Sequence, residues 1–159
     1  MPLESFQAKL ATPFAVLGIR TVGAMLTDIE YLPRGVATLA PLNKLAEQVC
    51  RQIERYLDDA QYRFKLPFDY CGSDFQCRVW REISKINSGK TKTYKELAQA
   101  IRSAPRAVGG ACGRNRLPLL IPCHRVLASN GIGGFMHARA GDPITIKKWL
   151  LTHEGAAFH

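Results

Sequence analysis

The first part of the chain alternates between short apolar runs and turn residues. Runs at residues 14–19 and 23–27 flank a glycine-containing turn, and residues 29–32 form a third. Runs of this length between turn residues predict β-strands. A helix follows from Pro41 to about Asp58, with Pro41 in its first turn, because apolar residues recur there every three or four positions: Leu42, Leu45, Ala46, Val49, Ile53, Tyr56 and Leu57. We therefore expect residues 1–70 to form a supporting α/β unit, a small antiparallel sheet plus one helix.

The second part, residues 71–159, has mainly helical spacing. Ser73 or Asp74 can cap a helix whose apolar positions continue to Ile86 and which residues 87–89 terminate. Thr93 can cap residues 94–101, and Glu96 stands where a capping box needs an acidic side chain. After a short break, residues 106–112 can form another helix. Two short helices joined by a tight turn predict a helix-turn-helix within a mainly α-helical C-terminal domain.

Charge is concentrated in the second part. The chain of 159 residues carries a net charge of +9, yet residues 1–73 are balanced, whereas residues 74–125 hold eleven Lys and Arg against three Asp and Glu. A basic segment favours a polyanionic partner, most commonly nucleic acid, although a solvated basic face is the plainer alternative.

Cysteine usage and hydropathy restrict the class further. There are five cysteines, an odd number, no CxxC pair and no secretory signal at the start, and no apolar window approaches the roughly 20 residues of a membrane span. We expect reduced thiols and a cytoplasmic location. The hydrophobic content of 47% is enough for a core without disulfides.

The candidate nucleophile is Cys123, which follows the apolar run 117–121 and Pro122 and precedes His124 and Arg125. An imidazole and a guanidinium beside a thiol predict a lowered thiol pKa and a reactive thiolate. A buried, inert thiol is the structural alternative.

Several blocks together resemble one known family, the O6-alkylguanine-DNA alkyltransferases. The resemblance runs from about Asp74 to Gly155. The matching blocks, in the same order and with similar gaps, are Phe75-Gln76 with Val79-Trp80, Thr93-Tyr94 with Leu97-Ala98, residues 106–109, Asn115, residues 121–126, and residues 148–155.

The resemblance implies a catalytic set. Cys123 would take the alkyl group, His124 would remove the thiol proton through a water, and Glu154 would orient His124. Asn115 would brace the active-site turn, and Tyr94 would press on a phosphate and donate a proton to the departing guanine. Because a thioether has no easy route back to a thiolate, each molecule would react once.

The resemblance also implies how DNA is held. Arg106 would enter the duplex and replace the flipped nucleotide, because a stacked guanine offers no in-line approach to its O6. Ala107, Gly109 and Gly110 would let their helix enter the minor groove, where sequence readout is weak. Two basic side chains complete the predicted DNA contacts, Arg114 and Arg125.

The loop after the cysteine departs from the family pattern. The family has Gly-Tyr there, and this chain has Gly134-Phe135, followed by a stretch of different length up to Pro143. We assign Phe135, Met136 and Val126 to the substrate pocket. No cofactor is implied. A structural zinc, found in some members, is not expected, because the first part has no histidine.

The sequence thus predicts direct reversal of O6-alkylguanine in double-stranded DNA, with O4-alkylthymine as a second candidate substrate. We expect a monomer, with cooperative binding on DNA left open. Two alternatives come from other classes: a sensor of alkylated bases that transfers nothing, and a Cys–His hydrolase that turns over. The preferred alkyl group, any regulatory role of the alkylated form and the effect of the atypical loop lie outside what the sequence defines.

Overall fold

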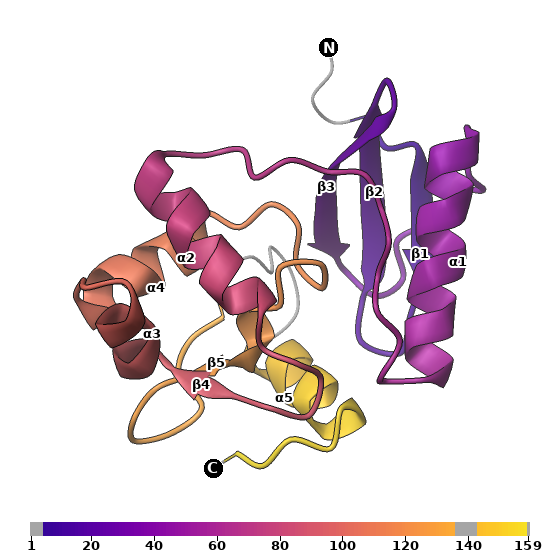
Figure 1. Ribbon diagram of the computed structural model, residues 1–159. Coiled ribbons are helices and arrows are strands. Elements are labelled where there is room, and N and C mark those ends of the chain that lie inside the picture. The colour runs from indigo at the N-terminus through magenta and orange to yellow at the C-terminus, as the bar shows by residue number, and fades with distance from the viewer. Residues whose placement is uncertain (1–4, 136–142, 159) are drawn as a thin grey trace.

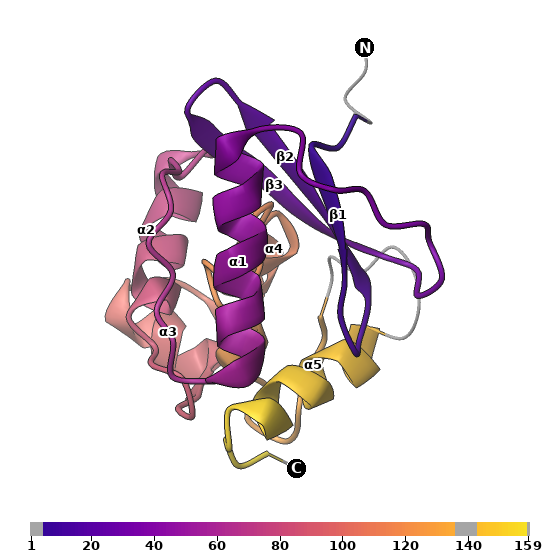
Figure 2. The same ribbon diagram turned by 90° about the vertical axis from the view of Figure 1, so that its right-hand side faces the viewer.

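A computed structural model describes residues 5–135 and 143–158 (Figure 1). The first part is a three-stranded antiparallel sheet in the order β1-β2-β3, with one helix packed on it. The strands are β1 (Ala8–Ala11), β2 (Val16–Val22) and β3 (Met25–Leu32), and the helix is α1 (Lys44–Asp58). Figure 2 shows α1 running across one face of the sheet. The sheet buries Ala8, Leu17 and Ile19 fully on its inner side.

The local details of this part differ from the sequence prediction in three places. Strand β1 was not predicted, because only two of its four residues are large. Residues 25–27 and 29–32 belong to one strand, β3, with Asp28 buried between them, whereas Gly23 and Ala24 form the turn before it. Helix α1 begins at Lys44, not at Pro41, because Asn43 caps it: its side chain accepts a hydrogen bond from the Ala46 N–H at 2.8 Å.

The second part follows the predicted order of helices more closely. Ser73 caps α2 (Asp74–Ser84) and Thr93 caps α3 (Tyr94–Ala100), each in a complete capping box. Helix α4 (Pro105–Gly113) begins with a proline in its first turn and completes the helix-turn-helix with α3. The remaining elements are β4 (Lys92–Thr93), the short 3₁₀ turn η1 (Cys123–Arg125), β5 (Val126–Leu127), which pairs with β4 in parallel, and α5 (Pro143–His153). The predicted fold class is confirmed.

The two parts share contacts along the edge of the sheet. A backbone hydrogen bond joins Ile29 N, in the edge strand β3, to Arg116 O at 3.0 Å. The Arg116 side chain also pairs with Asp28 at 2.8 Å. One continuous set of buried apolar residues runs through both parts. The division at residues 70 and 71 stays a prediction. Within the described ranges, no helix is long and apolar enough to cross a bilayer.

Candidate active site

Cys123 is positioned by a loop that Asn115 holds in shape. The Asn115 amide donates to Ile121 O at 2.8 Å and to the Cys123 Sγ atom at 3.2 Å, and its carbonyl accepts from Leu117 N at 2.9 Å. These bonds cross-link a segment in which Leu119 has the unusual φ of 79°. Because Asn115 is only 1% exposed, its hydrogen bonds are shielded from water. Asn115 therefore fixes where the sulfur points.

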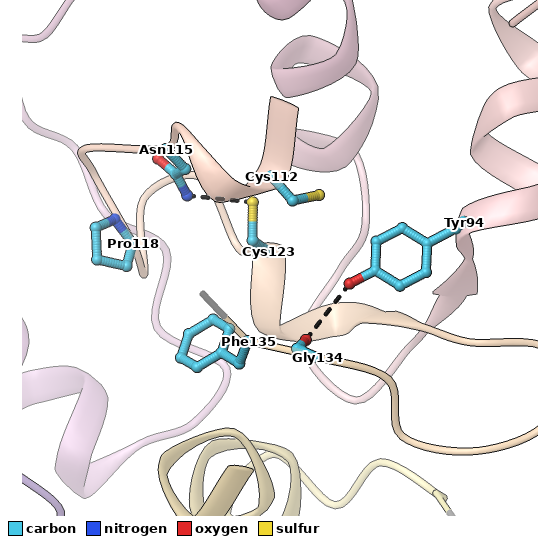
Figure 3. Close-up of a pocket in the computed structure, with 7 residues that line it drawn as sticks. All are labelled: Tyr94, Cys112, Asn115, Pro118, Cys123, Gly134 and Phe135. Atoms are coloured by element: carbon cyan, nitrogen blue, oxygen red, sulfur yellow. Dashed lines mark hydrogen bonds between the residues drawn. The ribbon is translucent and has the colours of Figure 1, made fainter. Parts of the chain in front are cut away.

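A pocket opens beside this sulfur (Figure 3). Tyr94 faces Cys123 from the start of α3, and its hydroxyl donates to Gly134 O at 3.4 Å. Phe135, 8% exposed, closes another side. The complete lining within the described residues is Tyr94, Cys112, Asn115, Pro118, Cys123, Gly134 and Phe135. Of the residues predicted for the pocket, Phe135 lies there, Val126 does not, and Met136 falls outside the described residues.

Behind Cys123 lies a buried network centred on the Glu154 carboxylate. His124 Nε2 is 2.8 Å from Glu154 Oε2, and Arg125 donates to both carboxylate oxygens at 2.8 Å. The Tyr56 hydroxyl, from α1, donates to Oε2 at 2.6 Å. Arg125 also donates to Ile86 O at 2.6 Å. A carboxylate with this many charge-assisted bonds is fixed in place and fixes His124 in turn.

The charges in this network are set by burial and pairing. Burial alone raises the pKa of Glu154, but the hydrogen bonds from His124 and Arg125 outweigh it and hold that pKa well below its usual range. Burial lowers the pKa of His124, more than the nearby carboxylate raises it. At neutral pH the site therefore holds an ionised Glu154 and a neutral His124. The Nδ1 atom of His124 is buried and has no hydrogen-bond partner among the described residues.

The prediction of a lowered thiol pKa at Cys123 is wrong. The neighbouring Cys112 thiol and burial raise the pKa of Cys123 well above its usual range, and Asn115 and Lys147 oppose this only in part. The physical reason is that the expected cations do not face the sulfur. Arg125 is paired with Glu154, and the imidazole of His124 is neutral. Cys123 is therefore a neutral thiol at rest, and it would need a base to act as a nucleophile.

Sequence reasoning missed Lys147, whose ammonium is fully buried beside the site. Its Nζ atom donates to Val126 O at 2.7 Å and to Gly134 O at 2.9 Å, so it ties β5 to the pocket wall. Burial lowers the pKa of Lys147 to about 8, although nearby Cys112 and Cys123 support the charged form. A lysine in the helical stretch 143–153 looks like a surface residue, and no local signal sets it apart.

Sequence reasoning also missed Tyr56 and gave Cys112 no role in the site. Tyr56 lies 98 positions before Glu154, and its periodicity marks it only as a core residue of α1. Cys112 lies in the last turn of α4 and is 7% exposed. A contact between distant segments gives no local pattern in the sequence.

The predicted DNA-contacting side chains of α4 lie on its exposed face. Arg106, Ala107 and Gly110 are exposed, Gly109 is half-buried, and no heavy atom lies within 4 Å of where a side chain would begin at either glycine. Arg114, just after the helix, is also exposed. Arg125 differs, because its guanidinium is engaged inside the protein. Because these bonds occupy the guanidinium, the structure does not support the predicted contact of Arg125 with DNA.

Metal binding has no visible basis in the part of the chain that the structure describes. No group of three or more Cys, His, Asp or Glu side chains there is arranged to hold a metal ion. All five cysteines are free thiols.

A helix-turn-helix beside a pocket that holds Cys123, followed in the chain by the buried His124–Glu154 pair, is the arrangement of a DNA-binding domain with a thiol at its site. A family model described as "6-O-methylguanine DNA methyltransferase, DNA binding domain" matches residues 74–156. The chain belongs to the O6-methylguanine-DNA methyltransferase family, and its enzyme class, a methylated-DNA–protein-cysteine methyltransferase, is the one predicted from the sequence.

Relatives agree with this assignment in sequence and in structure. A methylated-DNA–protein-cysteine methyltransferase from Archaeoglobus fulgidus is 39% identical over 109 residues, which cover 68% of this chain and 74% of the relative. The Mycobacterium tuberculosis OGT, solved in complex with DNA, superimposes with a TM-score of 0.74 at 30% identity, covering 92% of this chain and 91% of its own. An O6-methylguanine DNA methyltransferase from Methanococcus jannaschii gives a TM-score of 0.69 at 27% identity, covering 94% and 93%.

Proposed function

We propose that the protein repairs O6-alkylguanine in duplex DNA by moving the alkyl group irreversibly onto the Sγ atom of Cys123. The observation that carries this proposal is the placement of Cys123 on a pocket wall, with the His124–Glu154 pair, 2.8 Å apart, buried behind it. Family membership supports the same reaction class.

The transfer is an in-line displacement at carbon. The Cys123 sulfur attacks the alkyl carbon, a C–S bond forms, and the C–O6 bond breaks with its electron pair moving to the guanine. The thiol loses one proton and the departing base gains one, so charge balances. The products are guanine and a thioether. Since nothing in the reaction regenerates the thiol, we propose one reaction per molecule.

His124 is the base in this scheme. Its Nε2 contacts Glu154, which leaves the buried Nδ1 to accept the thiol proton, and we assign the transfer to a bridging water. A base is required because the pKa of Cys123 is raised. Glu154 orients the imidazole and stabilises the cation that forms, while Arg125 and Tyr56 hold Glu154.

Tyr94 serves the leaving group. Burial raises the pKa of Tyr94, so its phenol stays protonated and can donate a proton to the guanine as it leaves. We also retain the proposal that Tyr94 presses on a DNA phosphate. Phe135 offers an aromatic face on which the base can stack.

DNA binding is assigned to the exposed face of α4 in the minor groove. The missing side chains of Gly109 and Gly110 let a backbone approach closely, and Arg106 can enter the duplex beside the flipped base. Arg114 adds a cation at the end of the helix. We propose a monomer that works in the cytoplasm, and O4-alkylthymine as a second substrate; cooperative binding is a separate outcome to measure.

Intact-protein mass spectrometry tests the reaction. The protein is incubated with a duplex that contains one O6-methylguanine, and the peptides are then mapped. We expect one added methyl group per protein, on Cys123, and none in Cys123→Ala. The matched control is Cys77→Ala, which removes a thiol whose hydrogen bond goes to Tyr70 O, away from the pocket, and should react fully.

Two results would contradict the proposal. Tight binding of the methylated duplex with Cys123 unmodified would make the protein a sensor of alkylated bases. Continued release of product beyond one equivalent would make it a turnover enzyme.

A further inference from the structure

A second thiol lies on the wall of the same pocket. Cys112, in the last turn of α4, and Cys123, at the start of η1, both line it, as Figure 3 shows. The two residues are almost equally buried, with 7% and 6% of their surface exposed. The alkyl transfer uses only one of them, which leaves a buried nucleophilic group without a function.

The two thiols are neighbours on the pocket wall. Both side chains line the pocket, and Asn115 donates to the Cys123 sulfur from the loop between them. The Cys112 thiol raises the pKa of Cys123, and the cation of Lys147 acts on both thiols. The thiol of Cys77, by contrast, makes its hydrogen bond to a backbone carbonyl. Two neighbouring thiols, with a donor and a cation beside them, are a setting in which a disulfide can close.

We propose that Cys112 and Cys123 form a reversible disulfide when the protein meets hydrogen peroxide. The Cys123 thiol gives up its proton and its sulfur attacks one peroxide oxygen. The O–O bond breaks, a sulfenic acid forms on Cys123, and the other oxygen takes up the proton and leaves as water. Cys112 then attacks that sulfur, an S–S bond of about 2.05 Å forms, and a second water leaves. A dithiol reductant returns both residues to thiols.

The disulfide would preserve a nucleophile that can be used only once. Without a partner, a sulfenic acid is oxidised further to a sulfinic acid, which ordinary thiols do not reduce. With Cys112 on the same pocket wall, the oxidised site stops at a disulfide, which can be reduced again. This benefit rests on the proposed function, whereas disulfide formation itself does not.

Peptide mapping without reduction tests the linkage directly. The full-length protein is treated with hydrogen peroxide, free thiols are blocked with N-ethylmaleimide, and the protein is digested with trypsin. Cleavage after Arg106, Arg114, Arg116 and Arg125 places the cysteines on separate peptides, residues 107–114 and 117–125. We expect these peptides to be linked, with a loss of about 2 Da, and dithiothreitol to separate them.

Variants separate the pair from general oxidation. In Cys112→Ser, and in Cys112→Ala as a second replacement, Cys123 should proceed to the sulfinic acid and stay modified after dithiothreitol. Cys77→Ser should behave as the wild type. The same test is repeated in a Cys71→Ser background, because Cys71 is an exposed thiol that could link two molecules.

The proposal is overturned if wild-type Cys112 is recovered blocked by N-ethylmaleimide while Cys123 carries a sulfinic acid, or if Cys123 is linked to another cysteine. Because this readout needs no methylated DNA, it stands apart from any failure of alkyl transfer. Where alkyl transfer does occur, peroxide should abolish it in the wild type and in the Cys112 variants. Dithiothreitol should then restore it to the untreated level only in the wild type.

Discussion

Single residues in this site act through charges that the sequence does not reveal. Lys147 is a clear case, since its ammonium is completely buried yet is held by two carbonyls, Val126 O and Gly134 O. Its charge favours the thiolate form of Cys123, opposing the burial that disfavours it. The nucleophile therefore depends on a residue that touches neither its proton nor its base.

We expect Lys147→Met to lower the single-turnover rate of alkyl transfer about tenfold at pH 7, which corresponds to roughly 1.4 kcal/mol. Lys148→Met, at the exposed neighbouring position, is the matched control and should react normally. The pKa of Lys147 is about 8, so the wild-type residue is charged below that pH and neutral above it. The deficit of the variant should be complete below pH 8 and shrink above it. A deficit that is constant across this range would indicate a purely structural role.

Whole elements were predicted well where the signal is local. The caps at Ser73 and Thr93, and the Glu96 side chain that completes a box, were read from adjacent residues and are confirmed. The sequence pattern divides strand β3 because Asp28 interrupts its apolar residues. Its carboxylate is satisfied by Arg116, 88 positions away, and no local pattern reports such a partner. Cys123 and His124 could likewise be identified as site residues from their neighbours in the sequence. Tyr56 and Lys147 could not, because their contacts in the site are with distant segments.

Helix α4 carries a conflict between stability and the proposed binding role. Each glycine in a helix costs about 1 kcal/mol relative to alanine. Since open space surrounds Gly110, packing does not explain its presence.

We expect Gly110→Ala to raise the free energy of unfolding by about 0.5–1 kcal/mol in urea titrations while duplex affinity changes little. Gly110→Leu should be at least as stable as the wild type and bind the duplex about tenfold more weakly, measured by fluorescence anisotropy. Unchanged affinity in Gly110→Leu would remove this face from the DNA interface.

At the scale of the whole molecule, the first part is more than a passive support. Tyr56, on α1, reaches Glu154 in the second part, and the Tyr31 ring packs on Phe135 with 5.7 Å between ring centroids. His153 also contacts Tyr56 O at 2.7 Å. The buried network behind Cys123 is thus completed only when both parts of the chain are folded together.

Tyr56→Phe removes one hydroxyl and tests this coupling. The lost bond goes to a buried charged oxygen, so we expect the free energy of unfolding at pH 7 to fall by about 1.5–3 kcal/mol in urea titrations. Tyr70→Phe is the matched control: its hydroxyl bonds Ser84 at an exposed position, and its loss should cost about 0.5 kcal/mol or less. Because Glu154 orients His124 in the proposed mechanism, Tyr56→Phe should also slow alkyl transfer at pH 7 while duplex affinity stays the same. A variant that loses stability but reacts at the wild-type rate would limit α1 to holding the fold, and Arg125 would then be enough to hold Glu154 against His124.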